Sequence, residues 1–357
     1  MGGLDYGNAR LRAMRSRLLS SRDYARLMAT DSMDGLVAAL ADTAYGPDME
    51  AALTRYRGLR RFDEIVRVHL VRVLGAVKRF YEDPEQRLIE LLLDRWDLQN
   101  LRVILRGQAQ FLRSEEILHL VVPVGKLNSA ELTELGLQPS LRLVIDLMVA
   151  WGIPSRSTAR RLLDAWPAYE ATGDVVVLEV ALNAAFAERL DEVLGESEAG
   201  AAVVLRSEVD ETNLLTALRL RAARADGEIT MAEAGSVDRY LTAGRIRLAD
   251  LGAVAMTEDR SAVAALLGEA HLLPGWMDAL EAWADRDDLV TLTDDLRLAS
   301  TGVAVGLFHR GDPLSFDVPV AFTRAQEHEA QNLRWIARCL AHGLGLAELE
   351  RRVVVIT

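Results

Sequence analysis

The chain holds almost no cysteine, since Cys339 is the only one in 357 residues. A single thiol excludes an intramolecular disulfide and a cysteine-rich zinc module, and this usage fits a reducing compartment. Long apolar runs are absent as well, because none approaches the roughly 20 residues that a membrane-spanning helix needs. Arginines interrupt residues 1–20, where a secretory signal would need an apolar stretch. We therefore expect a soluble protein that works at a membrane only through a partner.

Positive charge is also in short supply. The formal net charge is −12 and the isoelectric point is about 5.1, and lysine occurs only at Lys78 and Lys126. Sequence-independent binding of nucleic acid needs a strongly cationic surface. Nucleic acid is therefore not an expected partner.

Motifs for catalysis are equally scarce. The pair Gly125–Lys126 is followed by a leucine, where a nucleotide-binding P-loop would carry serine or threonine. Cys339 and His342 lie one helical turn apart, but the sequence offers no further ligands to complete a metal site. We predict no catalytic residue, no cofactor and no metal, and hence a protein that is not an enzyme.

Helical periodicity dominates what is present. Apolar residues recur at steps of three and four in residues 27–40, 62–80 and 86–106. Runs of β-branched residues, such as 175–178 and 352–356, are short and isolated. The sequence therefore predicts an all-α protein.

One pattern occurs three times: an acid, two residues, Asn-Leu, four residues and an arginine. It reads DLQNLRVILR at 97–106, DETNLLTALR at 210–219 and EAQNLRWIAR at 329–338, and it holds half of the six asparagines. Such self-similarity indicates a repeat architecture. The pattern residues are Asp97, Asn100, Leu101 and Arg106, then Asp210, Asn213, Leu214 and Arg219, and finally Glu329, Asn332, Leu333 and Arg338.

A second correspondence supports the repeat. The segments VPVGKLNSAELTEL (122–135) and LTAGRIRLADLGAV (241–254) share a glycine, a basic residue and apolar positions at equal spacing. The spacing from Leu27 to Ser32 also recurs from Leu135 to Ser140. We predict three similar helical units, which can interleave in space. Their expected bounds are residues 1–112, 113–226 and 227–357.

The repeated motif allows two interpretations. On a helical wheel, Leu98, Leu101, Ile104 and Leu105 form an apolar face that contains the acid and has the asparagine on its margin. A buried polar group without a partner costs about 1–3 kcal/mol, so both side chains need hydrogen bonds. They could cap a helix or bond backbone at a helix junction, or they could form a binding or proton-handling site. Triplication favours the junction, and we expect the repeated arginines to reach a partner or a neighbouring acid.

The same residues resemble a known family. The opening YGNARLRAMRSRLLSSRDYARLM (6–28), TAYG (43–46), the three Asn-Leu segments and the closing segment 329–353 are similar to the C subunit of the V/A-type (vacuolar/archaeal-type) ATPases, whose eukaryotic counterpart is the d subunit of the V-ATPase. The resemblance runs from end to end. In the N-terminal block it rests on Tyr6, Asn8, Arg10 and Arg12.

The resemblance implies three helical domains in a pseudo-threefold funnel. It implies a non-catalytic rotor subunit of the central stalk, present once per complex, that couples the central shaft to the membrane proteolipid ring on the cytoplasmic face. The alternative is a free cytosolic helical scaffold related to this subunit. The resemblance leaves the coupling ion, the direction of operation and the role of a lengthened segment, 268–320, open. The loop residues Gly125, Lys126, Gly244 and Arg245 are candidates for one of the two interfaces.

Overall fold

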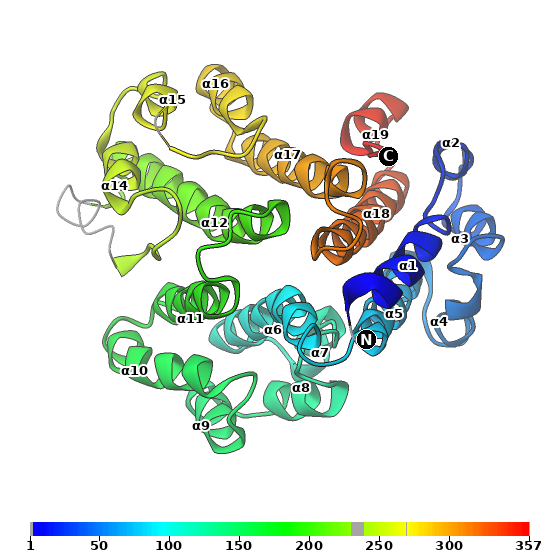
Figure 1. The fold of residues 1–357 in the computed structure, drawn as a ribbon, viewed down its shortest axis with the longest axis horizontal. Coiled ribbons are helices and arrows are strands. Elements are labelled where there is room, and N and C mark those ends of the chain that lie inside the picture. Colours follow the sequence, from blue (N-terminus) through cyan, green and yellow to red (C-terminus); the bar gives the residue numbers. More distant parts are fainter. Residues whose placement is uncertain (1–2, 230–238, 269, 357) are drawn as a thin grey trace. The chain divides into compact units, whose positions relative to one another are not determined.

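The computed structural model of the protein describes residues 3–229, 239–268 and 270–356. The regular elements of these residues are helices, and Figure 1 shows them coloured along the sequence. The all-α prediction is confirmed for this part of the chain.

The chain divides into two compact units. The first combines the residues up to Ile89 with those from Ala304 onward, and the second spans Glu90–Val303. Two long helices, α6 (Gln86–Ala109) and α17 (Leu289–Arg310), contain the boundary residues. The division predicted at residues 112 and 226 stays a prediction.

The first unit joins segments from both halves of the sequence. Helix α18 packs against α1, α3 and α5, and Figure 1 shows the blue α5 beside the orange α18. The helices and 3-10 turns of this unit are α1 (Leu4–Arg15), α2 (Ser21–Met28), α3 (Met33–Ala41), η1 (Gly46–Asp48), α4 (Glu50–Arg55), α5 (Gly58–Val77), η2 (Lys78–Phe80), α18 (Asp317–Ala341) and α19 (Leu346–Arg352).

Apolar periodicity explains why α5 packs against α18 in this unit. Buried positions on α5 recur at steps of three and four, from Phe62 through Ile65 and Val66 to Leu70. Such spacing places one stripe toward a neighbouring helix. The stripe packs on α18, whose Phe322 is fully buried.

The second unit contains two hydrophobic clusters. One gathers the apolar face of α6 with residues from the segment 117–182, and the other gathers α12 with residues from the segment 241–296. The helices that lie wholly in this unit are α7 (Ser114–Leu120), α8 (Ser129–Gly136), α9 (Leu141–Trp151), α10 (Arg156–Thr172), α11 (Val176–Leu194), α12 (Gly200–Ala225), α14 (Leu248–Met256), α15 (Ala262–Leu266) and α16 (Trp276–Arg286).

Segment 268–320, predicted to be a local lengthening, contributes to the second of these clusters. Helix α16 supplies Trp276 and Trp283, and both indole side chains are almost fully buried there. Indole groups bury a large apolar area, so they account for much of this core. The N-terminal half of α17 adds Leu292 and Leu296 to the same cluster.

Short polar residues fix where helices begin. Ser32 caps α3 by accepting the amide of Gly35, and Ser140 caps α9 by accepting the amide of Leu143. In each case the preceding short helix, α2 or α8, buries a leucine at the matching position. The apolar periodicity across 27–40 therefore spans two helices, because the cap at Ser32 separates them. The pair α2–α3 corresponds to α8–α9.

Candidate functional site: three acid–asparagine junctions

The first repeated motif lies in the middle of α6 and bonds to the loop before α8. The side chains of Asp97 and Asn100 are each 1% exposed. The Asp97 carboxylate accepts the backbone amides of Lys126 (2.6 Å) and Leu127 (3.0 Å). The Asn100 amide donates to the carbonyl of Val122 (2.8 Å) and accepts its N–H (2.7 Å). Both side chains thus provide hydrogen bonds to backbone groups of a buried loop, which lies outside any helix and lacks regular backbone hydrogen bonds.

Gly125 lets this loop approach the helix. A Cβ atom on Gly125 would lie 2.1 Å from an Asp97 carboxylate oxygen, well inside contact distance. Only a residue without a side chain fits there. Gly125, from the repeated glycine segment 122–135, therefore lies directly against Asp97, the acid of the first Asn-Leu motif.

The motif in α12 builds a junction of the same kind. Asp210 accepts the amide of Ile246 (3.0 Å), and Asn213 donates to the carbonyl of Thr242 (2.6 Å) and accepts its N–H (3.0 Å). A Cβ atom on Gly244 would lie 2.3 Å from the Asp210 carboxylate. Burial raises the pKa of Asp210, while the amides of Ile246 and Arg245 act in the opposite direction.

The motif in α18 bonds to segments from the start and the end of the chain. Glu329 accepts the amide of Leu19 and the hydroxyl of Tyr45 (2.9 Å). Asn332 donates to the carbonyl of Val354 (2.9 Å). Glu329 is 3% exposed, and burial raises its pKa to about 7 against the lowering effect of its two hydrogen bonds.

The three junctions share one geometric rule. Each acid accepts the amide of the residue that directly precedes a helix N-cap: Leu19 before α2, Leu127 before α8 and Ile246 before α14. These three helices have eight, eight and nine residues. A long helix is thereby pinned to the start of a short one in each case.

The third junction differs from the other two at the position of the glycine. Two residues before the donated amide, the second unit has a glycine in both junctions, Gly125 and Gly244. The first unit has Arg17 at this position. Glutamate is one methylene longer than aspartate, so its carboxylate can reach a backbone amide from farther away. The amide of Leu18, which corresponds in position to the Lys126 amide of the first junction, donates to the carbonyl of Arg15 instead.

The remaining motif residues have separate roles. The leucines Leu101, Leu214 and Leu333 are buried. Arg106 forms a two-pronged pair with Glu179 of α11, in which the Nη2–Oε2 distance is 2.6 Å. Arg219 is exposed, and the guanidinium of Arg338 lies 5.9 Å from the Trp335 ring centre. The structure therefore does not bring the three arginines into equivalent contacts.

The basic residues of the two glycine loops form ion pairs within the second unit. The Lys126 ammonium lies 3.4 Å from Asp94 and 3.6 Å from Glu90, and Arg245 lies 3.5 Å from Glu198. Their expected role as partner-binding loops stays a prediction.

The N-terminal block is divided between the interior and the surface. Asn8 is buried and donates to the carbonyls of Pro313 (3.0 Å) and Ser315 (2.8 Å), which ties α1 to the connection before α18. Tyr6 is exposed and accepts a hydrogen bond from Arg10, and Arg12 also lies at the surface. Asn8 is therefore a structural residue, and the other three are available at the surface.

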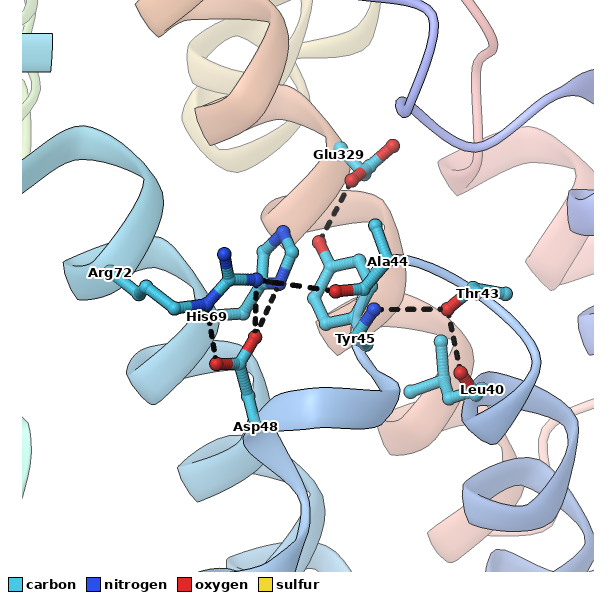
Figure 2. A network of polar contacts seen from close by, with 8 residues as sticks. All are labelled: Leu40, Thr43, Ala44, Tyr45, Asp48, His69, Arg72 and Glu329. Carbon is cyan, nitrogen blue, oxygen red and sulfur yellow. Dashed lines mark hydrogen bonds and ion pairs between the residues drawn. The ribbon is translucent and has the colours of Figure 1, made fainter. Parts of the chain in front are cut away.

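A polar network that the sequence did not predict adjoins the third junction (Figure 2). Asp48 accepts two hydrogen bonds from Arg72 (2.6 and 2.8 Å) and lies 2.8 Å from Nδ1 of His69. The His69 ring stacks on Tyr45 at a centroid distance of 3.7 Å. Burial would raise the pKa of Asp48, but the bonds from Arg72 and His69 outweigh it and leave that pKa lowered. Burial lowers the pKa of His69.

The described residues offer neither a metal centre nor a membrane span. Across 3–229, 239–268 and 270–356, no group of three or more histidine, cysteine or carboxylate side chains is arranged to hold a metal ion. In the same residues, no helix combines the length and the apolar character needed to cross a bilayer.

Comparison with known proteins identifies the family of the chain. The family model for the ATP synthase (C/AC39) subunit matches residues 7–352. The C subunit of a V-type ATP synthase from Deinococcus radiodurans is 27% identical over 98% of this chain and 90% of its own length. The C subunit of an A-type ATP synthase from Halorubrum lacusprofundi is 25% identical over 98% of this chain and 97% of its own. The resemblance inferred from the N-terminal block and the three Asn-Leu helices is thereby confirmed, and the chain belongs to the ATP synthase (C/AC39) subunit family.

Proposed function

We propose that this chain is a non-catalytic central-stalk subunit of a V/A-type rotary ATPase. In this role it is a socket in the rotor, and it couples the central shaft to the membrane proteolipid ring. Membership of the ATP synthase subunit family over almost the whole chain supports an assignment to that complex. The observation that carries the mechanical role is the acid–asparagine junction, built three times in one chain.

The chemistry of the junctions supports a structural role for the repeated acids. Asp97 and Asp210 hold backbone amides, and Glu329 holds one amide and one tyrosine hydroxyl. Catalysis by a carboxylate requires access to a substrate, whereas these three side chains are 1–3% exposed. Each acid therefore serves the fold.

We further propose that three helical modules stand around a pseudo-threefold axis and form a funnel. Each module would contain one long Asn-Leu helix and the short helix pinned to it. The matching helix pairs α2–α3 and α8–α9 support an equivalence between modules. In such a body the junctions transmit torsion, because a buried hydrogen bond is directional, whereas apolar contact is not.

The proposed location is the cytoplasmic face of the membrane, as a peripheral subunit present once per complex. The proposed partners are the shaft subunits on one side and the proteolipid ring on the other, with no bound cofactor. Surface residues of the glycine loops, Lys126 and Arg245, remain candidates for one of these contacts.

Fractionation of cells that express a tagged chain tests this assignment. The proposal predicts that the protein sediments with membranes and is purified together with the head, shaft and ring subunits of the ATPase. When the complex is stripped from the membrane, the protein should leave together with the shaft and the head. Recovery of the whole population as a free monomer would favour the alternative, a soluble helical scaffold, and would overturn the rotor assignment.

A further inference from the structure

The three junctions differ in the kind of donor that holds the acid. Asp97 is held by two backbone N–H groups, from Lys126 and Leu127. Asp210 likewise accepts from the amides of Ile246 and Arg245. Glu329 is held by one amide, from Leu19, and by the hydroxyl of Tyr45 (Figure 2).

We propose that the Glu329 junction is a proton-sensitive latch, which holds the α1–α2 connection and the Tyr45 turn on α18 when Glu329 is protonated and loosens when Glu329 loses its proton. Burial raises the pKa of Asp210 as well, so the contrasting case is the Asp97 junction, in which two backbone amides hold the carboxylate. The first compact unit thereby contains a pH-dependent attachment that joins α18 to two segments near the start of the chain.

The hydrogen-bonding capacity of each donor explains the difference. A backbone N–H can only donate, so a carboxylate held by two of them loses a bond when one of its oxygens is protonated. A tyrosine hydroxyl can donate or accept. Protonated Glu329 can therefore donate its own hydrogen to Tyr45 and still accept the amide of Leu19, so both contacts survive without a buried charge.

The surroundings also favour the neutral acid. Glu329 is 3% exposed, and a buried charge is costly unless it is well paired. Asp23 adds a like charge near the site, which also disfavours the ionised form of Glu329. Burial is the main cause of the raised pKa of about 7 for Glu329. The titratable and charged groups that act on Glu329 or on Tyr45 are Asp23 and Tyr24 on α2, Tyr45 itself, His69 on α5, and Arg334 on α18.

The latch acts on segments distant in sequence. Leu19 lies between α1 and α2, directly before the capping residue Ser20, and Tyr45 directly precedes η1. Both segments meet α18 through the one carboxyl group of Glu329. Loosening this contact frees the start of α2 and the η1 turn together, whereas α5 keeps its own apolar packing on α18.

The direction and range of the effect follow from proton linkage. The pKa of Glu329 is about 7 in the closed state, against an ordinary value of 4.5 when the site opens to water. The latch is therefore tightest below pH 4.5, weakens as the pH rises toward 7, and changes little above 7. Between pH 5 and pH 7, these two values correspond to a rise of roughly 40-fold in the opening equilibrium constant.

Hydrogen exchange at the Leu19 amide measures this opening directly in the full chain. After correction for the intrinsic exchange rate, we expect opening at Leu19 to increase by about 40-fold from pH 5 to pH 7 and by less than about twofold from pH 7 to pH 8. The Leu127 amide, bonded to Asp97 in the same molecule, should show no such rise. A flat profile at Leu19, or an equal rise at Leu127, would overturn the latch.

Two variants separate Glu329 from other titrating groups. Glu329→Gln keeps the shape but cannot titrate, so its Leu19 profile should be flat. His69 stacks on Tyr45 and is a second titratable group of this site; burial lowers its pKa, and it is unchanged in this variant. Tyr45→Phe removes one donor to the carboxylate, so opening should continue to rise between pH 7 and pH 8. If Glu329→Gln keeps the wild-type profile, or if Tyr45→Phe reaches its plateau at the same pH as wild type, the inference is wrong. The proposal does not depend on assembly with other subunits, so its failure would leave the rotor assignment untouched.

Discussion

Replacing Gly125 with alanine tests the junction geometry most sharply. The added Cβ atom would lie 2.1 Å from one Asp97 oxygen and 2.2 Å from the carboxyl carbon. No rotation of the new methyl group relieves this contact, so the carboxylate or the loop must move. Movement of the carboxylate breaks its bonds to the amides of Lys126 and Leu127.

The size of the effect can be worked from those two bonds. A hydrogen bond to a charged group contributes about 1.5–3 kcal/mol, and a buried acid left without partners adds a desolvation cost. Partial movement of the loop recovers some of this free energy. We expect Gly125→Ala to lower the free energy of unfolding of the second unit by about 3–5 kcal/mol.

A double-mutant cycle with Asp97→Ala provides the assay. Once the carboxylate is gone, the methyl group meets no obstacle, so the double variant should be about as stable as Asp97→Ala alone. The coupling free energy should then equal the effect of Gly125→Ala alone, about 3–5 kcal/mol in magnitude, measured by urea-dependent hydrogen exchange of α6 and α8 amides. Gly302→Ala is the matched control, because a Cβ atom there meets nothing within 4 Å, and it should stabilise α17 by about 0.5–1 kcal/mol. Additive effects, or a Gly125→Ala variant within about 0.5 kcal/mol of wild type, would refute the reasoning.

Three further predictions concern other contacts. Asn100→Leu should destabilise the second unit by about 2–3 kcal/mol in urea unfolding, because it leaves the N–H of Val122 buried without a partner and removes one of the two hydrogen bonds to the Val122 carbonyl; ATP hydrolysis by the isolated head should be unchanged, and unaltered unfolding would contradict the junction account. Gly7→Ala should cost about 1–3 kcal/mol, because its Cβ atom would lie 2.2 Å from the Tyr81 ring; a neutral effect on thermal unfolding would show that the ring can move freely. His69→Gln should flatten the loss of stability that wild type shows as the pH falls below 6.5, since burial lowers the pKa of His69 and its neutral form is the stable one; identical pH profiles of the two proteins in urea unfolding would exclude this role.

Parts of the fold and of the site were predictable from sequence. The periodicity of 86–106 predicts a helix, and it lies within α6 (Gln86–Ala109). The pattern of acid, asparagine and leucine predicts polar groups on an apolar face, and the structure gives each of these groups a hydrogen-bond partner in a distant segment. A repeated polar side chain on an apolar stripe is informative because such a group must be satisfied.

The pairing of helices with their partners was not predictable in the same way. A sequence repeat shows which segments are alike, but it does not show which segment each one contacts. The long helices α6 and α12 bond to loops that follow them, whereas α18 bonds to Leu19 and Tyr45 near the start of the chain. Tyr45 lies in the segment TAYG, yet only its position in space reveals it as the partner of Glu329. The substitution of glutamate for aspartate and the lack of a glycine at Arg17 were the available signals.

Single-molecule rotation tests the central claim, that this chain is part of the rotor. Val290 is 65% exposed on α17, while the native Cys339 is buried, so Val290→Cys accepts a bead or a fluorescent rod at one site. With the ATP-hydrolysing head fixed to a surface, the account predicts that the probe rotates in step with the shaft when ATP is added. A probe that stays still on this chain while the shaft of the same complex rotates would contradict it.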